Sequence, residues 1–303
     1  MIHFVDVTVT SSEPAVTHVL PGEAKVTGVT SLGDDVFVVR YDQSQQVEVY
    51  DAVTFTLQCR LSVPGLGTSV GLAACASNKC LYASGYSNDC IHRVELTGSN
   101  AVTEWSVGHY PEGLTVNNAR NVVVVIRDER KLQEFTTHGT LLQTIQLQQD
   151  IEFPRRVTEL TSGQFVISHI GTQHRVCLLG VQGAVVGSYG GAPGSDLTKM
   201  IWPAGLALDE HGNILVTDSG NNRLLVLDRS LTSAHEMFVS LDGGLKDARS
   251  LWYDKSRGRL YVGEWDGRRV IIIDHLKDFT ASHVSSGGAT PRSTAWTLPC
   301  LLL

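Results

Sequence analysis

Short apolar runs separated by turn-forming residues recur along most of the chain. The clearest run of each unit is rich in Val, Ile, Leu, Tyr and Phe, and it appears at 36–39, 81–84, 123–126, 165–168, 214–217 and 260–263. Apolar residues at consecutive positions of so short a run indicate a strand that is covered on both faces. No stretch of the sequence keeps a 3.6-residue apolar period. The pattern therefore predicts an all-β chain.

The units are spaced at roughly forty to fifty residues, a period typical of propeller blades. If the first turn-and-apolar step marks each unit, the six units begin near Gly28, Gly71, Gly113, Arg156, Gly205 and Ser250. A single four-stranded sheet cannot bury both faces, so the units must pack side by side, and closing them into a ring protects the sheet edges. We predict one six-bladed β-propeller of four-stranded blades over residues 24–284.

The ends of the chain complete this division. Residues 1–23 form an N-terminal segment, in which 15–20 is the expected strand that pairs into the last blade and closes the ring, with 2–9 as the alternative. Residues 285–303 are rich in small residues without periodicity and are expected to be a flexible tail. The tail ends in four residues that form a C-a-a-X box; a chance match is the favoured interpretation, and geranylgeranyl transfer to Cys300 is the alternative. A membrane is expected as a partner only if Cys300 is prenylated.

The fifth unit carries the sharpest motif. Gly-Asn-Ile-Leu-Val-Thr-Asp at 212–218 and Asn-Asn-Arg-Leu at 221–224 closely resemble the NHL repeat, and the resemblance continues through 260–274 and more weakly through 24–190. It implies a six-bladed NHL/TolB-like propeller. In animals such propellers are often the C-terminal domain of tripartite-motif ubiquitin ligases, where they recruit protein or RNA targets. These 303 residues include no RING, B-box or coiled-coil sequence.

Composition narrows the expected partners. A net charge of −7 argues against a protein that coats nucleic acid, so no DNA partner is expected. The sequence has no transmembrane run and no signal-peptide pattern at its start, which predicts a cytoplasmic protein. A monomer is also expected. Six scattered cysteines are expected to be buried small hydrophobes. Cys75, Cys80, Cys90 and His92 lack the close pairs of a structural zinc site, and neither metal nor cofactor is predicted.

Two sets of loops are expected to meet on one face of the ring, and two columns of the aligned units lie there. Arg40, Gly85, Arg127, His169, Asp218 and Glu264 end the second strands, while Gln46, Arg93, Lys131, Arg175, Arg223 and Arg269 open the third. The fork of Arg suits paired contacts with carboxylates. We predict a structural ion-pair column that joins blades and consists of Arg93, Lys131, Arg223, Arg269, Asp218 and Glu264.

The remaining cations and rings of these loops predict a binding face. Its expected members are Arg40, Tyr41, Tyr86, Arg127, Arg130, Arg155, Arg156, His169, Arg175, Trp202, Arg249, Trp265 and Arg268. Arg and aromatic side chains form hot spots for protein partners and also stack and hold single-stranded RNA. Interleaved acids favour a protein partner. Because Trp202 recurs with other aromatic-Pro pairs, part of it is expected in the core.

Catalysis is the competing class. Propellers similar to gluconolactonases or amidoglycolate lyases hold a metal near the axis, and Glu112, Asn117, Asp209, Glu264, His109, His169 and His174 are the matching residue types here. None of them forms a spaced ligand motif such as H-E-x-x-H. The sequence therefore predicts no catalytic residues and a non-enzymatic binding scaffold, with RNA binding and a metal-dependent lactonase or lyase as alternatives.

Overall fold

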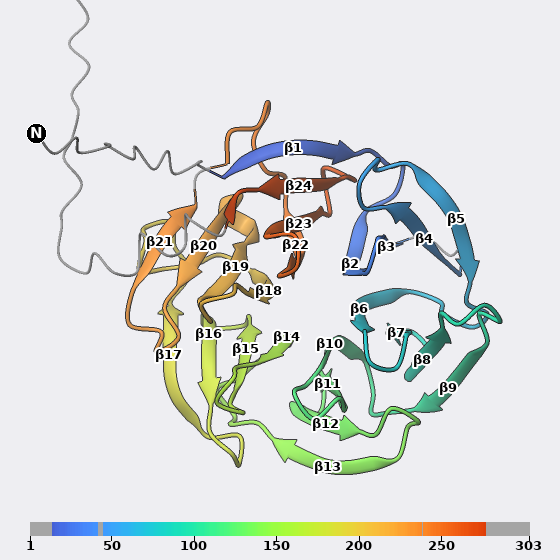
Figure 1. Ribbon diagram of the computed structural model, residues 1–303. Helices are drawn as coiled ribbons and strands as arrows, with labels where there is room; N and C mark the ends of the chain where they lie inside the picture. The colour runs from blue at the N-terminus through green and yellow to red at the C-terminus, as the bar shows by residue number, and fades with distance from the viewer. Residues whose placement is uncertain (1–13, 42–44, 238, 277–303) are drawn as a thin grey trace, which may run out of the picture.

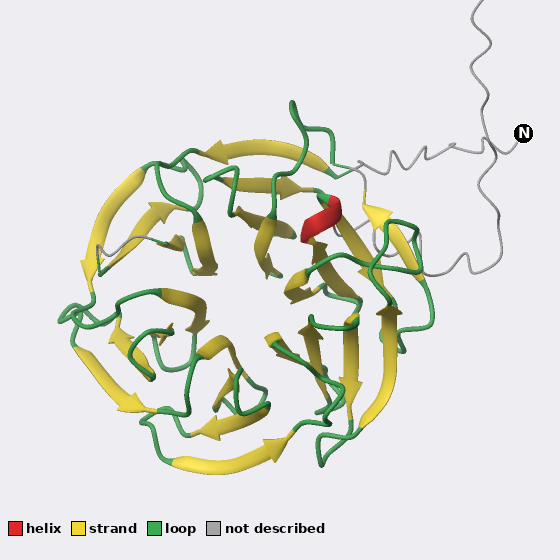
Figure 2. Cartoon of the chain, turned by 180° about the vertical axis from the view of Figure 1, so that it is seen from behind, coloured by secondary structure: helices red, strands yellow, loops and turns green. Residues whose placement is uncertain are grey.

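The protein is a ring of six antiparallel four-stranded sheets, seen along its axis in Figure 1. The computed structural model describes residues 14–276 apart from 42–44 and 238. The predicted six-bladed β-propeller is confirmed. In the view from behind, strands and loops make up nearly all of the described chain, and the one short helical turn is η1 (Ser219–Asn221) (Figure 2).

Each blade places its strands in order from the axis outward. The innermost strands are β2 (Val26–Leu32), β6 (Ser69–Cys75), β10 (Pro111–Val116), β14 (Pro154–Glu159), β18 (Pro203–Leu208) and β22 (Ala248–Asp254). The second strands are β3 (Asp35–Arg40), β7 (Cys80–Gly85), β11 (Val122–Ile126), β15 (Phe165–His169), β19 (Ile214–Asp218) and β23 (Arg259–Glu264). The third strands are β4 (Gln46–Asp51), β8 (Cys90–Glu95), β12 (Lys131–Phe135), β16 (His174–Leu179), β20 (Arg223–Leu227) and β24 (Val270–Asp274). The outer strands of blades one to five are β5 (Leu57–Ser62), β9 (Val102–Ser106), β13 (Leu141–Gln146), β17 (Val185–Gly191) and β21 (Ala234–Met237).

The N-terminal strand closes the ring. β1 (Ala15–Leu20) pairs antiparallel with β24 and is the outer strand of the sixth blade. This is the closure expected from the sequence. Residues 2–9, the tail 285–303 and Cys300 lie outside the described residues, so the structure does not address the expectations placed on them.

The apolar core consists of layers of side chains packed between neighbouring blades. All five residues of β11 are 0 % exposed, because blades press on both faces of this strand. One layer joins Val123, Val125 and Leu132 of blade three to Ile167 and Cys177 of blade four, and the other blades are joined in the same way. No helix in the described part of the chain is long and apolar enough to cross a membrane.

Candidate functional site

An irregularity at the start of every innermost strand places one residue of each blade at one mouth of the central channel. The strand register shifts at this point in all six blades, because the inner strand has an extra residue there. The residues at the shift are Thr27, Val70, Glu112, Arg155, Ala204 and Arg249, and all six line one pocket of about 200 Å³. We call it the mouth pocket. The next residue is Gly or Ser in five blades and Arg156 in the fourth.

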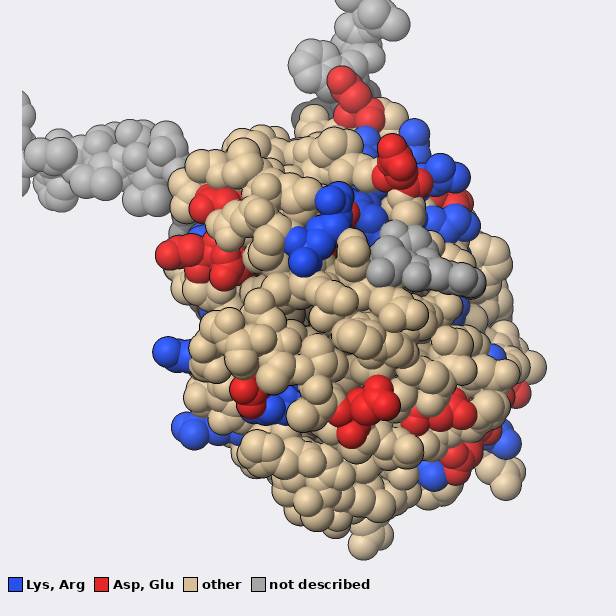
Figure 3. Space-filling model, turned by 90° about the vertical axis from the view of Figure 1, so that its right-hand side faces the viewer, with Lys and Arg blue, Asp and Glu red and all other residues tan. Residues whose placement is uncertain are grey.

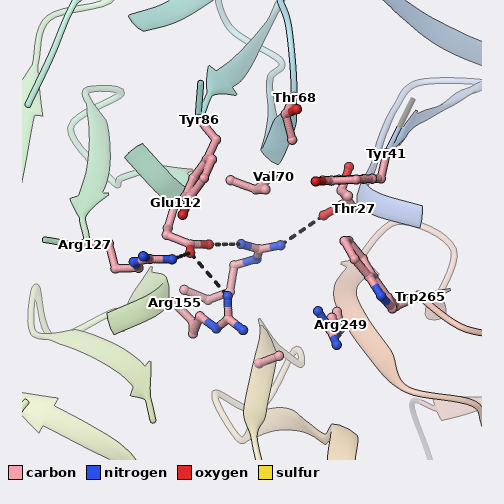
Figure 4. Close-up of a pocket in the computed structure, with 12 residues that line it drawn as sticks. Thr27, Tyr41, Thr68, Val70, Tyr86, Glu112, Arg127, Arg155, Arg249 and Trp265 are labelled. Carbon is pink, nitrogen blue, oxygen red and sulfur yellow. Dashed lines mark hydrogen bonds and ion pairs between the residues drawn. The ribbon is translucent and has the colours of Figure 1, made fainter. Parts of the chain in front are cut away.

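The centre of the mouth pocket is a single buried carboxylate shared by three arginines (Figure 4). The side chain of Glu112 is 3 % exposed. Its oxygens lie 3.2 Å from Arg155 Nη1, 3.5 Å from Arg127 Nη1 and 3.9 Å from Arg156 Nη1. Charge-assisted contacts of this kind are stronger than neutral ones, particularly where water is partly excluded. Glu112 therefore holds three guanidinium groups in place.

Arg156 spans the channel below this cluster. Its Nη2 donates a 3.0 Å hydrogen bond to the carbonyl oxygen of Thr27 in blade one, across the channel from its own blade four. Burial lowers the pKa of Arg156 to about 10; Glu112 counteracts the shift, and Arg155 and Arg249 add to it. A second cavity of about 220 Å³ also has Thr27 and Arg156 in its lining. Arg156 thus forms the floor of the mouth pocket.

Aromatic rings border the mouth pocket on two sides, and its outer arginines pack on them. The Cζ of Arg127 lies 5.4 Å from the ring centres of both Tyr86 and Tyr110, which stack on each other. On the other side of the mouth, the Cζ of Arg249 lies 4.3 Å from the ring centre of Trp265. These distances are those of cation–π contacts. Tyr41 packs against Trp265 and leaves about half of its own surface exposed.

Tyr110 and two further rings occupy equivalent positions, just before the first residue of an innermost strand. Tyr110, Phe153 and Trp202 have φ angles of 55°, 43° and 54°, in the left-handed region that large residues rarely adopt. Phe153 is 51 % and Trp202 50 % exposed. Trp202, of which only part was expected in the core, is thus half-buried. These rings lie at the same end of the blades as the mouth pocket.

Seven residues of the predicted binding face line the mouth pocket: Tyr41, Tyr86, Arg127, Arg155, Arg156, Arg249 and Trp265. The other six have different positions. Arg40 is 7 % exposed, because its guanidinium binds Glu48 and three backbone carbonyls, so it is a buried anchor of blade one. His169 is fully buried.

The remaining expected members contact the loops around the ring. Arg175 forms an ion pair with Asp150 at 2.6 Å and donates to Nε2 of His169. Arg130 binds the carbonyl oxygen of Gln149, and Arg268 binds that of Glu23. Trp202 lines a separate shallow pocket beside blade six. Basic and acidic side chains are interspersed on the side of the ring around β5 (Figure 3).

The ion-pair column is present within blades rather than between them. Arg223 of β20 binds Asp218 of β19 at 2.8 Å, and Arg269, just before β24, binds Glu264 of β23 at 2.6 Å, so each pair lies within one blade. Arg223 also donates to three carbonyls of the loop that enters blade five, so it fixes that loop. Lys131 pairs with Glu129.

The alignment of Arg93 with this column is wrong. Gly85 pairs with Cys90 where Asp218 pairs with Arg223, so Arg93 lies three residues further along its strand and binds Glu95.

The four residues weighed as a zinc set do not come together. Cys75 and Cys80 pair at one end of β7, whereas Cys90 pairs with Gly85 at the other end. Cys90 and His92 instead lie beside Glu104, and one ligand atom from each lies within 4.8 Å of the others. Burial raises the pKa of Cys90 to about 11, with Glu104 and Asp89 adding to the shift, which disfavours the thiolate form.

The residues that suggested catalysis form local contacts. Asn117 binds Glu134, and Asp209 binds the backbone and amide of Asn213 in its own turn. His109 contacts Asp89, and His174 accepts the backbone N–H of Trp202. Together with the arginine contacts of Glu112 and Glu264, these interactions leave the candidates without a common centre among the described residues.

Comparison with known proteins supports the same architecture. Residues 201–227 match the model of the NHL repeat. Together with six blades, this match supports an NHL-type propeller. No curated protein matches the sequence significantly.

Among solved structures, hydrazine synthase of Kuenenia stuttgartiensis superposes with a TM-score of 0.63 at 15 % identity, covering 90 % of this chain and 99 % of that one. A streptogramin B lyase gives 0.60 at 13 % identity, covering 86 % of this chain and 96 % of that one. Virginiamycin B lyase from Staphylococcus aureus with quinupristin gives 0.63 at 12 % identity, covering 88 % and 89 %. At such identities these likenesses show the fold alone.

Proposed function

We propose that the protein is a non-enzymatic recognition module that binds a protein partner over the mouth of its channel. The observation that carries this proposal is the surrounding set of half-exposed rings, Tyr41, Phe153 and Trp202, next to arginines packed on further rings. Aromatic and Arg side chains dominate the binding energy of protein interfaces, because they bury large areas at low entropic cost. Large residues in a left-handed backbone conformation also cost free energy, and such strain is concentrated at functional sites.

The test replaces the two most exposed rings of this set. Native protein and a Phe153→Ala/Trp202→Ser variant are used to capture partners from cells that express the protein, and each captured partner is purified and titrated against both forms. A Leu141→Ser/Leu142→Ser variant is the matched control, because these side chains on β13 are 49 % and 50 % exposed on the outer strand. We expect at least tenfold weaker binding for the ring variant, in line with hot-spot losses of about 2 kcal/mol or more, and native binding for the control. Equal affinity of the ring variant would refute the proposed face.

We extend the proposal to recruitment of ubiquitin-ligase targets, which the resemblance to tripartite-motif proteins implies. Capture of a RING-bearing ligase together with the partner would support this extension. Capture of the partner without a ligase would restrict the function to binding.

A further inference from the structure

The charges of the mouth pocket are unbalanced. Four of its lining residues are arginines and one, Glu112, is an acid. Arg249 is matched by Asp247 through two contacts of 2.9 and 2.6 Å, and Arg127 by Asp128 at 3.1 Å. Arg155 and Arg156 share Glu112 as the carboxylate of their described ion pairs. The cluster therefore keeps an excess of positive charge at the bottom of a partly buried pocket.

The arginines remain accessible despite this crowding. The side chains of Arg127, Arg155 and Arg249 are 24 %, 28 % and 28 % exposed, whereas that of Glu112 is 3 % exposed. An incoming group thus meets guanidinium nitrogens before it meets the carboxylate. Guanidinium forks bind planar carboxylates through two hydrogen bonds. The geometry is that of an anion site in which the guanidinium groups donate hydrogen bonds and the carboxylate of Glu112 lies behind them.

The pocket is closed below and bordered by rings on two sides. Arg156 forms its floor, and the volume of about 200 Å³ is below the roughly 300–1,000 Å³ of sites for whole small-molecule ligands. Tyr86 lies on one side of the mouth, and Tyr41 and Trp265 lie on another (Figure 4). A chain that rests on both groups of rings can point one side chain into the pocket, but it cannot pass through the channel.

We propose that the mouth pocket receives one acidic side chain, Asp or Glu, from the protein partner, with Arg155 as its principal donor and Arg127 and Arg249 beside it. This inference rests on the proposed function and names the chemistry that the partner must bring. A nucleic-acid backbone fits less well, because its phosphates follow one another along a strand whereas the pocket is blind and has an acid at its base.

The experiment uses short probes with the 303-residue chain. An acetylated, amidated pentapeptide with a central Glu is titrated while the arginine Nε–Hε signals are followed by NMR. Three further probes are the same peptide with Gln, the Gln peptide with a free C-terminal carboxylate, and inorganic phosphate. Arg155→Gln removes the donor. Arg60→Gln is the matched control, since Arg60 is half-exposed on β5 and contacts Glu48.

We expect saturable binding of the Glu peptide, about tenfold weaker binding to Arg155→Gln, as for the loss of one charged hydrogen bond, and native binding to Arg60→Gln. Preference for the free C-terminus or for phosphate, equal weakening by Arg60→Gln, or no saturation would overturn the inference. If the Glu peptide fails while partner capture still requires Phe153 and Trp202, the carboxylate assignment is wrong and the proposed function stands. If the Glu peptide binds but the ring variant still captures every partner, the proposed face fails separately.

Discussion

Replacing Glu112 by Gln separates the two roles of this carboxylate, because it should weaken the fold and strengthen anion binding. The substitution keeps the shape of the side chain and removes the only charge that Arg155 and Arg156 share in the described structure. Removing one partner of a buried ion pair costs about 3–5 kcal/mol, since the other charge is left uncompensated. Here the three arginine side chains are 16–28 % exposed, so water relieves part of the penalty. We expect the free energy of unfolding to fall by about 2–3 kcal/mol.

Urea unfolding at pH 7 measures this loss, and an unchanged m-value would show that the extent of unfolding is the same. Glu236→Gln is the control, because its side chain is 48 % exposed and 3.7 Å from Arg223, and we expect a change within about 0.5 kcal/mol. In the Glu112→Gln variant the acidic peptide should bind more tightly, because the peptide carboxylate no longer competes with the carboxylate of Glu112. A Glu112→Gln protein as stable as the native one, or one with weaker peptide binding, would refute the assigned charge balance.

Three further predictions concern the ring, its pH dependence and nucleic acid. Gly113→Ala should destabilise the fold by about 1–3 kcal/mol in urea unfolding, because the new Cβ would lie 2.7 Å from a backbone oxygen of the next blade. Gly191→Ala is the control and should be neutral, because its Cβ would have no heavy atom within 4 Å. Burial, reinforced by Arg175, lowers the pKa of His169 to about 4 from 6.5, so the unfolded state binds the extra proton between these values. Stability should therefore fall as the pH decreases from about 6.5 to 4, by roughly 3 kcal/mol from this group, and His169→Gln should flatten the profile obtained by urea titration at each pH. Fluorescence polarisation with a random single-stranded RNA pool should show no tight binding at physiological salt; sub-micromolar binding that is abolished by Arg127→Glu would reverse our order of protein over RNA.

The fold was predictable because the same pattern of buried strands and turns recurs in every blade. Each second strand is covered on both faces, so an unbroken apolar run such as that of 122–126 is required and is visible in the sequence. The closing strand was also visible, because a ring of these blades needs one more strand for its last sheet. Both signals are local in sequence; the first depends on burial and the second on strand pairing in the last sheet.

The site was only partly predictable, because it depends on strand register and on contacts across the ring. Arg40 and Arg127 occupy the same column of the aligned units. Arg40 is buried because it binds Glu48 on the next strand, whereas Arg127 lies at the channel mouth. Arg93 was misaligned because its place depends on how the hairpin pairs Gly85 with Cys90. A signal for Arg156 was present, since it is the one large residue in the column of small marker residues.

That column shows how a repeated scaffold acquires a specific site. Small residues at the marker position let the inner strands approach the neighbouring blade; a Cβ on Gly71, for example, would lie 2.8 Å from the backbone oxygen of Glu112. Arg156 breaks this rule in blade four and extends across the axis, where it makes contact with blade one through Thr27. The space that this requires is supplied by Gly113, beside which Arg156 packs. One exception to the repeat therefore closes the channel and turns its mouth into a pocket, while the preceding column supplies three of the charges that line it, Glu112, Arg155 and Arg249. If the proposed function holds, differences between blades at these two columns, rather than the repeat itself, set what the face binds.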